Sequence, residues 1–207
     1  MLSGVYLRQF VFTAQTSTKG EGLTLTYFSN YVRQILSISD KTSLNGMVEK
    51  LVEIIRNHRG LIFVVGNGGS SAIAEHFVTD LSRASNVSGE PVKAMFLGSN
   101  TSLLTADAND FGYAEVFSRQ VRKFGSDGDI LVAISSSGNS ANVISAILES
   151  RNLGLVTLAL TGFDGGEVSK ISDVCIHVAT ENGAYEHVED IHAMICHFVA
   201  MRLRERI

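Results

Sequence analysis

The chain of 207 residues contains no tryptophan, one proline and two cysteines. Cys175 and Cys196 lie alone in apolar patterns, so they predict buried thiols in a reducing compartment rather than a disulfide framework. No apolar run approaches the length of about 20 residues that a membrane-spanning helix needs. The N-terminus lacks the basic start and the long apolar core of a signal peptide. The sequence therefore predicts a cytoplasmic protein with no membrane partner.

The chain also has few charges, and none of its basic residues form a block. Charged residues make up 18% of the sequence, hydrophobic residues 45%, and the net charge is −4. This composition predicts a globular chain with a sizeable core, and the lack of basic patches argues against nucleic acid as a partner. Residues 1–24 show no clear period, and the stretch from Ser17 to Gly22 is typical of a flexible linker. We expect an N-terminal extension over 1–24 and a single domain over 25–207.

Helical spacing from Leu25 to Asn57, broken near Ser39, predicts two N-terminal helices. After them, short apolar runs alternate with helical patterns. The expected strands are Leu61–Val65, Val92–Phe96, Ile130–Ile134, Val156–Leu160 and Val174–Val178. The expected helices lie from Ser70, near Thr101, near Ala114, from Ser140, near Glu167 and from Ala184 to the C-terminus. Because the strands are apolar at nearly every position, helices should cover both faces of the sheet. The pattern predicts an α/β fold with a doubly wound, five-stranded parallel sheet flanked by helices.

Two polar turns follow expected strands. Gly66–Ser71 ends the first strand, and Ser135–Ser140 ends the third. Backbone N–H groups at a helix start, together with hydroxyls, can surround a phosphate without a lysine. The first turn lacks the lysine of a P-loop, and taken alone it also fits a plain tight turn. The second holds four serines where one helix cap needs one, although Ser140 could be that cap. The sequence therefore predicts a phosphorylated small molecule as ligand.

Two helices carry ionisable residues at spacings that place them on one face. His76 and Asp80 are four residues apart, and Glu189 and His197 are eight apart. Two imidazoles and two carboxylates suit Zn²⁺ or another divalent ion, and they suit general acid–base catalysis equally well. From spacing alone, each pair also fits an ordinary solvated face. The other histidines are expected to be structural or on the surface: His177, His187 and His192.

Five motifs occur in an order that resembles a known family. They are Gly66–Ser70, His76–Phe77, Asn109–Gly112, Ser135–Val143 and Leu160–Gly166. Together they resemble the sugar isomerase (SIS) domain family, most closely its phosphoheptose isomerases, from about Leu25 to the C-terminus. The resemblance implies a flavodoxin-like three-layer fold, a homotetramer, and isomerisation of sedoheptulose 7-phosphate to D-glycero-D-manno-heptose 7-phosphate through an enediol. The alternative is a non-catalytic member that binds a sugar phosphate or a protein partner.

The resemblance also implies roles for residues. The implied substrate-binding residues are Asn67, Gly68, Gly69, Ser70, Asp110, Ser135, Ser136, Ser137, Ser140 and Glu189. One Zn²⁺ per subunit is implied at His76, Asp80, Glu189 and His197, where the family has glutamate at position 80 and glutamine at 189. Because an enediol needs a base at carbon and an acid at oxygen, we expect Asp80 as the carbon base and His197 as the acid–base at the oxygens.

Overall fold

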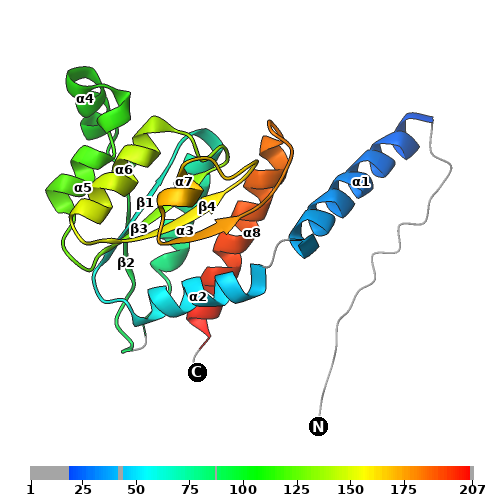
Figure 1. Cartoon of the computed structure of the whole chain (residues 1–207). Helices are drawn as coiled ribbons and strands as arrows, with labels where there is room; N and C mark the ends of the chain where they lie inside the picture. The colour runs from blue at the N-terminus through cyan, green and yellow to red at the C-terminus, as the bar shows by residue number, and fades with distance from the viewer. Residues whose placement is uncertain (1–18, 42–43, 87, 206–207) are drawn as a thin grey trace, which may run out of the picture. The chain divides into compact units, whose positions relative to one another are not determined.

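The computed structural model describes residues 19–41, 44–86 and 88–205 (Figure 1). Two N-terminal helices are present, α1 (Lys19–Lys41) and α2 (Leu44–Asn57), with the expected break between them. α1 begins at Lys19, so the predicted linker is wrong for residues 19–22, while residues 17 and 18 lie outside the described part. α1 up to Gln34 forms a unit of its own, and a second unit begins at Ile35. The domain boundary expected after residue 24 stays a prediction.

The second unit contains the predicted sheet, whose five strands are all parallel (Figure 1). The strands are β1 (Leu61–Gly66), β2 (Lys93–Phe96), β3 (Ile130–Ser135), β4 (Val156–Thr161) and β5 (Val174–His177). They lie in the order β2-β1-β3-β4-β5. This order confirms the doubly wound sheet, because the chain winds outward from β1 in both directions.

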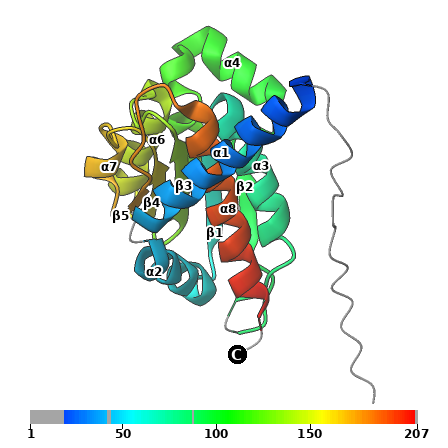
Figure 2. The same cartoon turned by 90° about the vertical axis from the view of Figure 1, so that its right-hand side faces the viewer.

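Helices cover the sheet in two layers. They are α3 (Gly68–Leu81), α4 (Thr101–Phe111), the short η1 (Tyr113–Glu115), α5 (Ser118–Phe124), α6 (Ala141–Asn152), α7 (Val168–Ile171) and α8 (Tyr185–Arg204). α8 contacts both α2 and α3, α3 packs on β1, β2 and β3, and α2 packs on β5. α6 and α7 contact β3, β4 and β5, α5 packs on α6, and α4 contacts η1. Figures 1 and 2 both show α3 and α8 side by side. Within the described ranges, no helix has the length and apolar character of a membrane span.

Alternate strand residues form the core beneath α5 and α6. Phe63 of β1 and Leu131 of β3 are fully buried there against Ile147 of α6 and Phe117. All six residues of β3 are buried. Burial on both faces explains why these strands are apolar at nearly every position.

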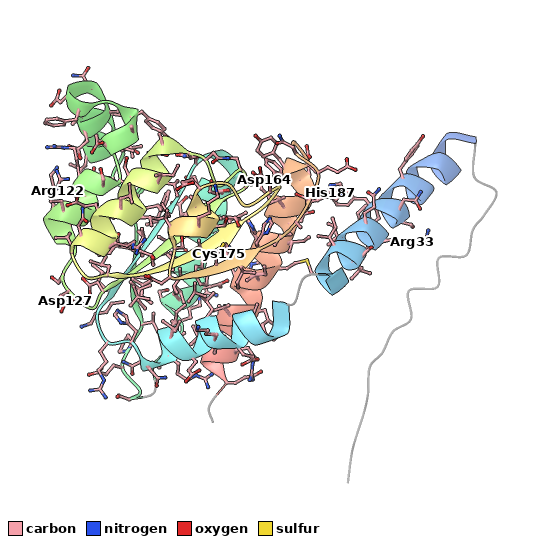
Figure 3. The ribbon with its side chains drawn as sticks, in the orientation of Figure 1. Arg33, Arg122, Asp127, Asp164, Cys175 and His187 are labelled. Atoms are coloured by element: carbon pink, nitrogen blue, oxygen red, sulfur yellow. The ribbon has the colours of Figure 1, made fainter. Side chains whose placement is uncertain are left out.

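The register of β1 and β3 fixes the place of the two polar turns. Gly66 pairs with Ile134, so the glycine turn and the serine turn leave the sheet beside each other. β2 lies on one side of β1 and β3 on the other, which makes this the point where the strand order reverses. Ligands of open α/β sheets bind at such a point, outside the carboxyl ends of the strands. Figure 3 shows that edge at Asp164, which follows β4, and the opposite edge at Asp127, which precedes β3.

The loop after β4 supports the serine turn through backbone contacts. Gly162 N–H donates to the carbonyl oxygen of Ser136 at 2.9 Å, and Val168 N–H donates to that of Gly138 at 2.9 Å. Gly138 has a φ of 64°, and a Cβ added there would lie 2.1 Å from the carbonyl oxygen of Gly165. Position 138 therefore requires glycine both for its backbone angle and for its close approach to the neighbouring loop.

Replacing Gly138 by alanine should lower the free energy of unfolding by about 2–4 kcal/mol, since a left-handed conformation and an overpacked contact both oppose the new methyl group. Urea denaturation followed by circular dichroism measures the loss. Gly128→Ala is the matched control, because Gly128 has a φ of 83° and open space around its Cβ position. Equal losses in the two variants would contradict the role of the contact with Gly165.

Candidate functional site

A cavity of about 230 Å³ lies where the glycine turn, the serine turn and the start of α8 meet. Its lining residues are Asn67, Gly68, Gly69, Ser70, Ile134, Ser135, Ser136, Ser137, Ser140, Tyr185 and Glu189. We call it the serine cavity. It brings together every predicted substrate-binding residue except Asp110. Asp110 is exposed near the end of α4, where its carboxylate accepts a hydrogen bond from Asn109 Nδ2 at 2.9 Å, so its sugar contact stays a prediction.

The hydroxyl groups of the serine turn are only partly used by the protein. Ser135 Oγ and Ser137 Oγ accept hydrogen bonds from backbone N–H groups at 3.2 Å, which leaves both hydroxyl hydrogens to donate. Ser140 occupies the N-cap position of α6, but its side chain makes no capping hydrogen bond, so the alternative of a side-chain cap is not formed. Ser136 Oγ is buried without a partner in the described part of the chain. Since buried polar atoms are normally paired, this hydroxyl is available to a ligand or a water molecule at the cavity.

The glycine turn is held by an amide pair. Asn67 and Asn142 exchange two side-chain hydrogen bonds, with N–O distances of 2.8 and 3.0 Å. Tyr113 of η1 donates a third from its hydroxyl to Asn67 Oδ1 at 2.9 Å. These bonds fix the carboxyl end of β1 against the first turn of α6, so the two polar turns keep a defined separation.

Sequence reasoning assigned no role to Asn142, Tyr113 or Tyr185. Asn142 lies within the serine motif and Tyr113 directly follows Asn109–Gly112, so their place in the motifs was the available signal. Tyr185 lines the serine cavity and packs edge-on against Phe163, with ring centroids 5.0 Å apart. Tyr185 precedes Glu189 by one turn of α8, and no pattern in the sequence distinguishes it.

The predicted cluster on α3 and α8 forms with three of its four members. Asp80 Oδ2 lies 3.5 Å from His76 Nε2 and 3.9 Å from His197 Nε2. One ligand atom from each residue lies within 4.8 Å of the others. The Asp80 carboxylate is buried and both imidazoles are exposed. The two imidazoles line a mostly apolar cavity whose wall also includes Cys196. Because zinc ligands lie about 2.0–2.2 Å from the ion, the oxygen and nitrogen atoms are spaced closely enough to share one ion after small side-chain movements.

Glu189 does not lie in this three-residue group. Its carboxylate rests against Gly69, where an added Cβ would approach the carboxylate atoms to within 2.2–2.4 Å. Burial raises the pKa of Glu189, and the nearby negative charges of Glu186 and Asp190 raise it further. The structure therefore places this carboxylate in the serine cavity rather than between the two imidazoles.

The buried face of α8 carries two further groups with shifted pKa values. His192 is fully buried and neither ring nitrogen has a hydrogen-bond partner among the described residues. Burial lowers the pKa of His192 to about 4, and the nearby backbone of Thr161 opposes this only in part. Burial and the charge of Asp80 raise the pKa of the Cys196 thiol. A neutral histidine and a protonated thiol agree with the structural roles expected for both residues.

His192 should make the folded state sensitive to acid. Its pKa in the folded protein is about 4, below the ordinary value of 6.5, so the unfolded chain binds a proton between these pH values that the folded chain does not. The stability it contributes is complete above pH 6.5 and falls by roughly 3 kcal/mol as the pH drops to 4. Urea denaturation at several pH values measures this slope. His192→Leu should flatten it, and an unchanged slope would show that other groups cause the acid sensitivity.

Comparisons with known proteins agree with this geometry. The family model of the SIS domain matches residues 26–162. A phosphoheptose isomerase of Akkermansia muciniphila is 36% identical over 187 residues, which cover 86% of this chain and 98% of that protein. One from Helicobacter pylori (strain P12) is 38% identical over 156 residues, covering 75% and 80%.

A solved structure shows the same likeness in three dimensions. The phosphoheptose isomerase of Neisseria gonorrhoeae superposes with a TM-score of 0.78 at 32% sequence identity, over 88% of this chain and 97% of that one. The matches extend over most of this chain and of its relatives. The chain therefore belongs to the SIS domain family, among its phosphoheptose isomerases.

Proposed function

We propose that the chain is an aldose–ketose isomerase that converts sedoheptulose 7-phosphate to D-glycero-D-manno-heptose 7-phosphate. The observation that carries the proposal is the pairing of the serine cavity with the His76–Asp80–His197 group along the same two helices. The serine cavity offers hydrogen-bond donors to an anion, and the three-residue group offers metal ligands and acid–base groups. The relatives named phosphoheptose isomerase support the choice of substrate.

The distance between the two sites supports a long phosphosugar. Ser70 lines the serine cavity, and His76 follows it by six residues of α3, a rise of about 9 Å along the helix. A heptulose 7-phosphate carries its phosphate and its carbonyl toward opposite ends of a seven-carbon chain. With the phosphate at the serine turn, such a substrate can extend along α3 until its carbonyl end reaches the histidines.

The phosphate would be bound by neutral donors. No lysine, arginine or histidine lines the serine cavity in the described part of the chain. Binding would therefore depend on the hydroxyls of the serine turn and on the backbone N–H groups of the first turns of α3 and α6, where the helix dipoles favour an anion. This arrangement would fix the substrate by its phosphate, which does not react, and leave its carbonyl end free to reach the histidines.

We propose one zinc ion per subunit, held by His76, Asp80 and His197. The buried carboxylate between two imidazoles fits a divalent ion, and we leave Glu189 out because its side chain lies in the other cavity. When bound, the ion would polarise the sugar carbonyl. His197 would move the proton at the oxygens, because an imidazole can both accept and donate a proton. The role of Asp80 as the carbon base stays a prediction.

We also propose a homotetramer with an apolar interface along α8. Met194, Phe198 and Met201 lie exposed on this helix, next to the exposed ring of His197. Exposed apolar groups that gather on one helix are typical of an association surface. Burial of this face against another subunit would also withdraw the histidine group from bulk water.

The proposed reaction is tested by NMR of sedoheptulose 7-phosphate with the protein in D₂O, with and without Zn²⁺. New aldose signals establish isomerisation, and deuterium at the adjacent carbon shows exchange through an enediol. If the sugar phosphate raises the melting temperature of the protein but no product forms with or without Zn²⁺, the result favours a non-catalytic sugar-phosphate binder or an isomerase of a different phosphosugar.

His76→Ala should remove the bound metal and lower turnover by at least about a hundredfold, because the group loses one of two imidazoles and its acid–base geometry. Metal content after purification and the rate of aldose formation are the two measurements. Glu75→Gln, an exposed change at the preceding position, is the control and should keep both. Full activity of His76→Ala would exclude the histidine group from the reaction.

A further inference from the structure

Asn67 occupies the N-cap position of α3 without capping the helix. Its backbone is extended, with a φ of −117° and a ψ of 152°, and asparagine is among the residues preferred at this position. Its side chain nevertheless makes no capping hydrogen bond. The N–H groups of the first turn, from Gly68 to Ser70, have no acceptor within the helix, and a capping asparagine would bind one of them.

The side-chain oxygen of Asn67 is fully used by two other residues. Asn142 Nδ2 donates to Asn67 Oδ1 at 3.0 Å, and the hydroxyl of Tyr113 donates to the same oxygen at 2.9 Å. Because an amide oxygen has two lone pairs, these two donors leave none for an N–H group of α3. Asn67 Nδ2 in turn donates to Asn142 Oδ1 at 2.8 Å, so the amide is held through both of its polar atoms.

The uncapped start of α3 lies at a cavity that holds a further unused donor. Gly68, Gly69 and Ser70 line the serine cavity together with Ser136. Ser136 is only 6% exposed, and its hydroxyl has no partner in the described part of the chain. The hydroxyl and the first-turn N–H groups can therefore donate to one anion in the same space. If Asn67 capped α3, its oxygen would compete with that anion for the same N–H groups.

We propose that Tyr113 and Asn142 are positioning residues, which bind Asn67 Oδ1 so that Asn67 does not cap α3 and the start of this helix stays open to a ligand phosphate. The inference rests on the phosphate position given under the proposed function. Neither Tyr113 nor Asn142 belongs to the described lining of the serine cavity, so both act through Asn67. Tyr113 belongs to η1 and Asn142 to the first turn of α6, so two separate segments together keep one helix start uncapped.

The experiment measures by calorimetry the affinities of the full chain and its variants for inorganic phosphate and for sedoheptulose 7-phosphate. Tyr113→Phe removes only a hydroxyl from an exposed side chain, and Asn142→Ala removes both bonds of the amide pair. Each change is repeated in an Asn67→Ala background, which completes a double-mutant cycle. Tyr27→Phe is the matched control, because it removes the same group from an exposed tyrosine of α1. Thermal melting confirms that each variant is folded.

Tyr113→Phe should bind phosphate roughly two- to tenfold more weakly than the unaltered chain, the range that one hydrogen bond covers. Asn142→Ala should weaken binding further, since it removes two bonds. In the Asn67→Ala background both changes should have little effect, because no side chain remains at position 67 to cap α3. Tyr27→Phe should bind phosphate like the unaltered chain.

Two further measurements separate positioning from a general structural role. In ¹⁵N-labelled Tyr113→Phe without phosphate, the amide proton of Gly69 or Ser70 should exchange more slowly than in the unaltered chain, because Asn67 then caps it. In the isomerisation assay, Tyr113→Phe should raise KM and leave kcat nearly unchanged, as expected when substrate and transition state lose the same contact.

The proposal is overturned if Tyr113→Phe weakens phosphate binding equally with and without Asn67, because the hydroxyl would then act independently of it. Unchanged affinity of Tyr113→Phe, unchanged exchange at both amides, or no phosphate binding by any of the proteins would also overturn it. Its failure is distinguishable from that of the proposed function. Isomerisation with equal KM values for Tyr113→Phe and the unaltered chain removes only the positioning role. Coupled effects on phosphate binding without any isomerisation remove only the enzymatic function.

Discussion

The parallel pairing of β1 with β3 is the constraint on which the rest of this structure depends. It places the carboxyl ends of two buried strands side by side, so that a glycine turn and a serine turn face one cavity. The strands themselves are held by burial on both faces, and the loop after β4 closes on Gly138 from the far side. The serine cavity is therefore built from backbone geometry first, and the hydroxyls complete its lining.

The contact between α3 and α8 connects the serine cavity to the His76–Asp80–His197 group. α3 begins at the glycine turn and carries His76 and Asp80 further along, while α8 contributes Glu189 near its start and His197 two turns later. Because the two helices lie side by side, a ligand fixed at one end of α3 is aligned with the imidazoles further on (Figure 2). The proposed binding and reaction sites are separated along a helix pair, which suits an extended substrate better than a short one.

The two carboxylates of the site, Asp80 and Glu189, have different electrostatic surroundings. The described lining of the serine cavity offers neutral donors, and its single formal charge is the negative one of Glu189. Asp80 has two imidazoles beside it, whereas Glu189 has two acidic neighbours. Burial and the two acidic neighbours raise the pKa of Glu189, because desolvation and like charges both disfavour the charged form of a carboxylate.

The sequence by itself determined the strand and helix order, the doubly wound sheet, the two polar turns and the pairing of His76 with Asp80, because periodicity and turn residues are local properties. It also predicted nearly all residues of the serine cavity from ordered motifs. Tertiary structure alone decided that Glu189 rests on Gly69 while His197 reaches Asp80, although both lie on one face of α8. It also decided that Tyr113 and Asn142 hold Asn67. Helical spacing specifies a shared face, but the neighbour that each side chain meets depends on how two distant helices pack.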